Sequence, residues 1–206
     1  MSLSAWSVFA LFWVLFVVTP GPNAVNCIGN GLTHGFRRSL WGVAAILTQA
    51  TLFLLLSAAG IAALIVASPT AFFWARMIGA AFLIWLGIRG LVSAKRPVSS
   101  RPAPARSIYG RALLIATVNA KSVAGYLAAF SQFVEPGVPI WNQMIVITPT
   151  ALTITALSYT GYTALGAALG RAAMGAVLNV WFRRVMGACF VVYGALLGAS
   201  GLVEAA

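Results

Sequence analysis

The chain has 206 residues, of which 61% are hydrophobic and only 7% are charged, and its mean hydropathy is +0.96. Soluble domains carry about 25% charged residues, so this chain has too few to cover its surface in water. Its net charge of +11 comes from basic residues that lie between long apolar runs, which excludes a soluble enzyme, a disordered tail and a nucleic-acid binder. The composition therefore predicts an all-α integral membrane protein.

Apolar runs along the chain predict six transmembrane helices, since a helix needs about 20 apolar residues to cross the hydrocarbon core. A charge interrupts only the fourth run, which contains Lys121. The first run has no basic segment before it and is too long for the core of a signal peptide, so we expect it to be retained as a span. The runs cover residues 1–36, 39–75, a stretch between Arg76 and Arg89, 112–134, 140–170 and 185–203.

Basic residues near the ends of the runs predict the orientation of the chain. The first, third and fifth connections hold ten of the 13 basic residues, and the second and fourth hold none. Because cytoplasmic loops are enriched in Lys and Arg, we expect the odd-numbered connections inside and both termini outside. The ten residues are Arg37, Arg38, Lys95, Arg96, Arg101, Arg106, Arg111, Arg171, Arg183 and Arg184.

A basic, Pro/Ser-rich stretch at 95–107 divides this single membrane domain into two halves. Residues 1–94 and 108–206 would each hold three helices, and an odd number of spans inverts one half relative to the other. Inverted repeats with interrupted helices at matching places are a recurrent transporter design. We therefore predict two inverted three-helix repeats joined by a cytoplasmic linker.

Two polar interruptions fall at corresponding places in the halves. The first contains two prolines, which remove backbone donors and unwind a helix; the alternative is a plain helix end. The second contains Lys121, about ten residues from each end of its run, where a lysine costs about 3 kcal/mol on insertion scales. The alternative there is a lysine that reaches water and has no transport role. The residues singled out are Thr19, Pro20, Gly21, Pro22 and Asn23 in the first break, and Asn119 and Lys121 in the second.

Further polar residues within the runs are predicted to line a cavity. Gln49 interrupts the second run and Gln132 lies late in the fourth, while Tyr159 and Tyr162 share one helical face in the fifth. The alternative is hydrogen bonding between helices, which is worth about 0.6 kcal/mol per bond in membranes. The one histidine, His34, lies beside a predicted loop, so we expect no catalytic residue, no metal site, no cofactor and no enzyme activity.

The pattern as a whole resembles the LysE/RhtB family of amino-acid exporters along nearly the whole chain. The order and spacing of several motifs make the resemblance fairly specific. The motifs are Thr19 to Pro22, Gly35-x-Arg37-x-x-x-x-Gly42, Gly79 to Gly87, Asn119-Ala120-Lys121 and Gln132-Phe133.

The resemblance implies a multi-pass exporter of amino acids or related metabolites in a bacterial inner membrane, driven by an ion gradient and able to form a homodimer. Its expected partners are a small-molecule substrate and membrane lipid, with no nucleic acid. The family's Asn-Pro-Lys is Asn119-Ala120-Lys121 here, which predicts a less broken fourth helix. The acidic residue of many relatives' second span is missing, since only Thr48 and Gln49 stand there, which disfavours a cationic substrate.

These observations give a mechanistic hypothesis. Lys121 and Asn119 would bind the substrate carboxylate beside the exposed backbone of residues 20–23, and the two halves would alternate access to the site. Two other functions stay open from sequence alone: an exporter of a different solute, and a non-transporting membrane scaffold or assembly protein.

Overall fold

The computed structural model describes residues 2–95, 107–135 and 137–205, and all the regular structure in them is helical. The all-α prediction is thereby confirmed for this part of the chain. Most of the predicted linker, residues 96–106, lies outside the described residues. The helices are α1 (Leu3–Val18), α2 (Pro22–Ala67), α3 (Pro69–Val92), α4 (Ile108–Thr117), α5 (Ala120–Phe133), α6 (Ile140–Leu169), α7 (Arg171–Val177) and α8 (Val180–Ala205).

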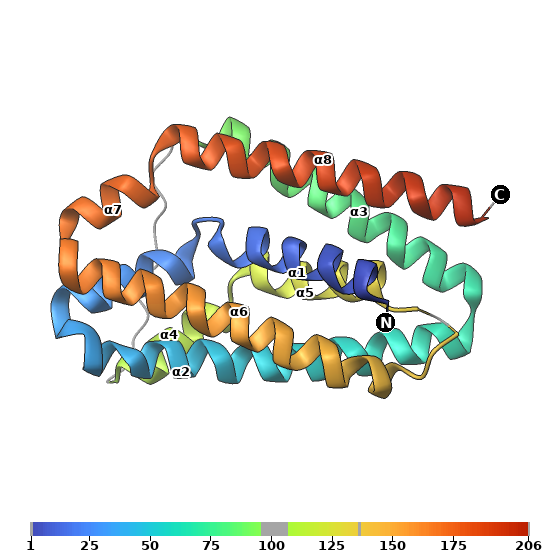
Figure 1. The fold of residues 1–206 in the computed structure, drawn as a ribbon, viewed down its shortest axis with the longest axis horizontal. Helices are drawn as coiled ribbons and strands as arrows, with labels where there is room; N and C mark the ends of the chain where they lie inside the picture. The colour runs from blue at the N-terminus through green and yellow to red at the C-terminus, as the bar shows by residue number, and fades with distance from the viewer. Residues whose placement is uncertain (1, 96–106, 136, 206) are drawn as a thin grey trace.

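Helix α2 consists of two segments, residues 22–34 and 36–67, which meet at Gly35. Gly35 has φ 72° and ψ 170°, a conformation that a residue without Cβ adopts at little cost. The chain reverses direction at this point (Figure 1). A single glycine therefore divides residues 22–67 into two segments, and Asn30 of the first lies beside Gly42 of the second.

The long helices form two pairs, α2 with α6 and α3 with α8, and α1 and α5 lie between the pairs (Figure 1). The most extensive contacts join α2 to α6 and α3 to α8, and α1 and α5 contact members of both pairs. At one end of the second pair, the Arg183 guanidinium of α8 donates to the carbonyls of Ser93 (2.8 Å) and Ala94 (2.7 Å), just beyond the end of α3. The arrangement surrounds α1 and α5 with longer helices.

Figure 1 places both chain ends at one end of the molecule, together with the connections from α2 to α3 and from α5 to α6. The turn at Gly35, the start of α4 and α7 lie at the opposite end. Two of the connections predicted to be basic, the turn within α2 and the region of α7, therefore lie at the end away from the termini.

Four stretches of the described chain are long and apolar enough to cross a membrane: Pro22–Ile61, Thr70–Val92, Ile140–Leu169 and Val180–Ala199. Helices α1 and α4 are also apolar but shorter. Large apolar side chains cover the outside, and Leu56, Ile78 and Ile145 are each at least 68% exposed. Such a surface suits contact with lipid, in agreement with a membrane protein.

Glycines bring the first segment of α2 against α6. A Cβ at Gly31 would collide with the carbonyl of Thr163 and lie 2.9 Å from the backbone nitrogen of Ala167. Gly166 in turn lies against the backbone of Ile28. Small residues let two helix backbones approach closely in membranes, and this contact fixes the height of α2 against α6.

We expect Gly31→Ala to destabilise the protein by about 1–3 kcal/mol, because the added methyl group meets backbone that cannot rotate away. Gly29→Ala is the matched control, since a Cβ there meets nothing within 4 Å. Thermal unfolding of the detergent-solubilised variants measures the difference. Equal midpoints for the two variants would contradict the close contact.

Candidate functional site

The end of α1 leaves backbone carbonyls without the donors that a continuing helix would supply. In a continuing helix, each carbonyl accepts from the N–H four residues later in the chain. For Phe16 and Val18 those residues are Pro20 and Pro22, which have no N–H. Thr19 is the C-cap of α1. It donates both its N–H (3.1 Å) and its hydroxyl (2.6 Å) to the carbonyl of Leu15. Two acceptors inside the protein therefore need partners from elsewhere.

Lys121 of α5 supplies the first of these partners. Its Nζ donates to the carbonyl of Phe16 at 2.5 Å and to that of Thr19 at 2.8 Å, and lies 5.0 Å from the centre of the Phe16 ring. Gly21 is adjacent, since a Cβ there would lie 3.8 Å from Lys121 Cδ. A cation at a helix C-terminus also interacts favourably with the helix dipole. The lysine thus pairs with backbone, as an intramembrane lysine needs to.

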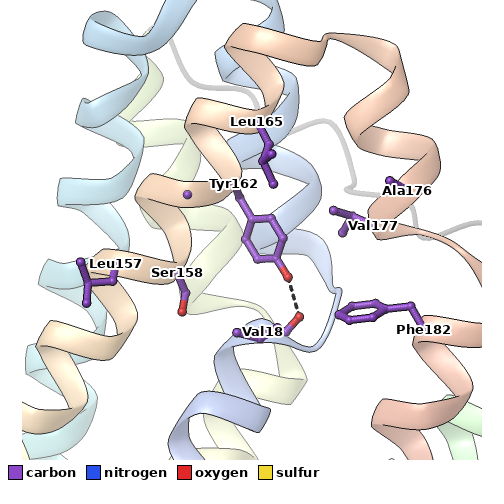
Figure 2. Close-up of a pocket in the computed structure, with 9 residues that line it drawn as sticks. Val18, Leu157, Ser158, Tyr162, Leu165, Ala176, Val177 and Phe182 are labelled. Carbon is purple, nitrogen blue, oxygen red and sulfur yellow. Dashed lines mark hydrogen bonds between the residues drawn. The ribbon is translucent and has the colours of Figure 1, made fainter.

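Tyr162 of α6 supplies the second partner. Its hydroxyl donates to the Val18 carbonyl at 2.5 Å (Figure 2). Tyr159, one turn earlier, is buried with its ring centre 6.2 Å from that of Tyr162, and its hydroxyl lies within hydrogen-bond reach of the Asn23 side chain. The two tyrosines therefore place hydroxyl groups beside both sides of the first break.

The second break separates α4 from α5. Helix α4 ends at Thr117, and Asn119 caps α5 by accepting from the Lys121 N–H at 3.2 Å while donating to the Ser122 hydroxyl at 3.1 Å. The expectation of a less broken fourth helix was wrong. Although Ala120 stands where the family has proline, α4 ends at Thr117, and the Asn119 side chain accepts from the Lys121 N–H as the N-cap that begins α5.

The structure brings together nine of the eleven residues selected from the sequence and separates the other two. Gln49 is only 1% exposed and lies on the second segment of α2. Gln132 lies eleven residues beyond Lys121, about 16 Å along α5, where its amide donates to the Arg76 carbonyl of α3. The residues around the breaks are Thr19, Pro20, Gly21, Pro22, Asn23, Asn119, Lys121, Tyr159 and Tyr162.

Two further residues, Asn26 and Asn30, were not selected from the sequence. They are 6% and 7% exposed, and neither Nδ2 has a hydrogen-bond partner among the described residues. Together with Asn23 they follow the spacing i, i+3, i+7, which places three asparagines on one helical face. The sequence shows this spacing, which indicates a polar helical face, but the run around it carries no charge to mark it as a polar site.

A cavity of about 360 Å³ adjoins the first break (Figure 2). It lies between the end of α1 and helices α6, α7 and α8, and Tyr162 and Ser158 are the polar side chains in its wall. The remaining wall is apolar or glycine: Val18, Leu157, Gly161, Leu165, Ala176, Val177 and Phe182. Tyr162 and Val18, which the hydrogen bond joins, thus form part of the wall of an open, mainly apolar pocket.

We expect Tyr162→Phe to lower the free energy of unfolding by about 1 kcal/mol, because it leaves the Val18 carbonyl without its donor. Tyr109→Phe is the control, since the Tyr109 hydroxyl donates to the exposed Thr48 hydroxyl and not to a backbone carbonyl that has lost its helical donor. Thermal unfolding in detergent compares the two. A larger loss in Tyr109→Phe than in Tyr162→Phe would count against a structural role for the Val18 bond.

Comparison with known proteins identifies several relatives. The sequence profile of the family described as LysE type translocator matches residues 14–201. An uncharacterized membrane protein of Vibrio cholerae is 34% identical, with 97% of this chain and 99% of the relative covered. A homoserine/homoserine lactone efflux protein of Salmonella typhimurium is 27% identical, covering 97% and 98%. A leucine efflux protein of an Enterobacter species is 28% identical, covering 78% and 77%. No solved structure matches the chain.

Proposed function

The chain belongs to the LysE type translocator family, and from this premise we propose that it exports amino acids or closely related small metabolites from the cytoplasm by alternating access. The relatives named for homoserine, homoserine lactone and leucine efflux support this class of substrate. The observation that carries the proposal is the contact of Lys121 with the carbonyls of Phe16 and Thr19, because it joins the two interrupted helices at a buried polar centre.

The two halves, residues 1–94 and 108–206, would act as inverted three-helix repeats linked by residues 95–107. In the first half, α1 and residues 22–34 together would form one membrane crossing, residues 36–67 would form the second, and α3 would form the third. In the second half, α4 and α5 together would form the first crossing, α6 the second and α8 the third. The matching interruptions at Pro20 and Asn119 support this correspondence, since each falls between two helical segments in line.

The odd-numbered, basic connections would face the cytoplasm and both termini the outside of a bacterial inner membrane. The gathering of both chain ends at the end away from Gly35 and α7 supports this orientation (Figure 1). Membrane lipid would contact the exposed apolar surface, and a second copy of the chain is the expected protein partner.

Lys121 would have two tasks in this mechanism. Two of its three N–H donors hold the end of α1, so the substrate carboxylate would take the third. The contacts of Lys121 with α1, and of Tyr162 with Val18, all cross from one half to the other. Any movement of one half relative to the other would therefore have to break these hydrogen bonds or move their donors and acceptors together. A substrate carboxylate that competes for Lys121 would weaken its bonds to α1.

Cells that express the protein and are loaded with amino acids through fed dipeptides test the proposal. We expect faster appearance of one or a few amino acids in the medium, and a fall of at least about tenfold in Lys121→Ala, because each lost charged hydrogen bond is worth about 1.5–3 kcal/mol. Mass spectrometry of the medium gives the rates.

The exposed Lys95 provides the matched control, and Lys95→Ala should export at the wild-type rate. Lys121→Arg keeps the charge but not the compact ammonium, so it should recover only part of the activity. Export at full rate by Lys121→Ala, at equal membrane content, would remove Lys121 from the mechanism.

Fusions of reporter proteins to the C-terminus test the orientation. We expect alkaline phosphatase, which is active only outside the inner membrane, to be active when it follows residue 206 and inactive when it is inserted within residues 95–107. The opposite result would invert the topology and place the basic connections outside, against the distribution of Lys and Arg.

A further inference from the structure

Three asparagines form an unpaired polar strip along the first segment of α2. Asn23, Asn26 and Asn30 are each at most 7% exposed, and Asn23 Oδ1, Asn26 Nδ2 and Asn30 Nδ2 have no hydrogen-bond partner in the part of the chain that the structure describes. Buried side-chain amides are normally bonded, because an unpaired one costs its full desolvation penalty. Three on one helical face therefore call for a functional explanation.

Contacts on either side show which way the asparagine strip faces. Cys27 and Gly31, on the neighbouring face, contact α6 at Thr163. Asn30 instead lies beside Gly42 of the second α2 segment, where a Cβ would be 3.1 Å from Asn30 Nδ2. Within the asparagine strip, Asn30 therefore faces the second α2 segment, whereas Asn23 lies against Tyr159 of α6.

Helix α4 packs beside Gly42 as well. A Cβ on Gly42 would lie 3.6 Å from Ile108 and 3.7 Å from Ala112, both on α4. Gln49 lies seven residues beyond Gly42, hence on the same face of the second segment, and its Nε2 is also buried and unpaired among the described residues. Buried amide groups with unpaired atoms therefore stand on both segments of α2.

The asparagine strip connects the basic end of the molecule with the central break. Asn30 is close to the turn at Gly35, and the exposed Arg37, Arg38 and Arg111 lie near that turn and near the start of α4. At the other end, Asn23 interacts with Tyr159 and is two residues from Gly21, which lies against Lys121. Seven residues of helix span about 10 Å between these points.

We propose that Asn23, Asn26 and Asn30, with Gln49, form the cytoplasmic access path by which zwitterionic amino acids with uncharged side chains reach Lys121; this inference rests on the proposed function. Each amide offers both a donor and an acceptor, so together they can bind a carboxylate and an ammonium. Arg37, Arg38 and Arg111, at the cytoplasmic end of the asparagine strip, raise the local concentration of carboxylates.

The charge pattern gives the selectivity. No acidic residue lies on α2, α4 or α6, so an ammonium group on a substrate side chain finds no carboxylate partner along the asparagine strip. A cationic amino acid would be left with an unpaired ammonium on its side chain and is rejected. An uncharged side chain carries no such penalty.

Export of homoserine, leucine and lysine, each fed as a dipeptide, tests this inference. Asn26→Leu and Asn30→Leu conserve approximate volume and remove the amide, so export of homoserine and leucine should fall about tenfold per molecule of inserted protein, the effect of one lost hydrogen bond to a charged group. Asn30→Asp adds a carboxylate of the same shape and should raise the ratio of lysine to homoserine export about tenfold.

Gln143→Leu is the matched control for loss of a buried amide. Gln143 is also 1% exposed, but its amide is fully engaged with the backbone of Glu135 and Val138 at the opposite end of the molecule. It should change the amount of inserted protein and leave the export ratios unaltered. A fluorescent C-terminal fusion normalises export to protein, and Asn26→Ser and Asn30→Ser replace any leucine variant that fails to accumulate.

Wild-type rates in Asn26→Leu and Asn30→Leu, or an unchanged lysine ratio in Asn30→Asp, would overturn the inference, provided that the wild type exports and Lys121→Ala does not. That pattern would leave the proposed function standing and assign the asparagines to packing. If the wild type exports none of the three amino acids, the proposed function itself fails and takes the access path with it.

Discussion

The architecture depends on one constraint: the carbonyls at the end of α1 must find donors inside an apolar protein. Pro20 and Pro22 remove the two N–H groups that would have served Phe16 and Val18. Lys121 and Tyr162, both from the other half of the chain, replace them. Unpaired backbone is not tolerated at membrane depth unless protein or a cavity satisfies it, so the break in α1 determines where α5 and α6 must lie.

The same constraint concentrates the polar chemistry of the chain. An apolar protein with two acidic residues has few means of binding a small zwitterion. The interrupted helix provides partial negative charge at its carbonyl end, Lys121 provides the positive charge, and the asparagines on α2 provide neutral donors and acceptors. Membership of a translocator family gives this polar centre a use that a merely structural lysine and a set of unpaired amides would lack.

Much of the candidate site followed from residues that break the rules for a membrane span. Proline pairs and a central lysine are costly in lipid, and these two features identified the central residues. Reasoning from the missing proline at position 120 was wrong about the fourth helix, because α4 ends at Thr117 and the Asn119 side chain caps the start of α5. Asn26 and Asn30 were missed because asparagine is polar without being charged, and so it interrupts neither a hydropathy count nor a charge map.

The sequence by itself determined the membrane class, the helical secondary structure, the family and the positions of both breaks. These depend on composition and on local backbone chemistry, which a linear pattern records directly. Only the tertiary structure decided that Lys121 holds the end of α1, that Gln132 lies at the interface with α3, and that Asn30 lies beside Gly42. Such pairings depend on which helices pack together and at what height, and close contacts such as those of Gly31 and Gly42 set that height across long sequence separations.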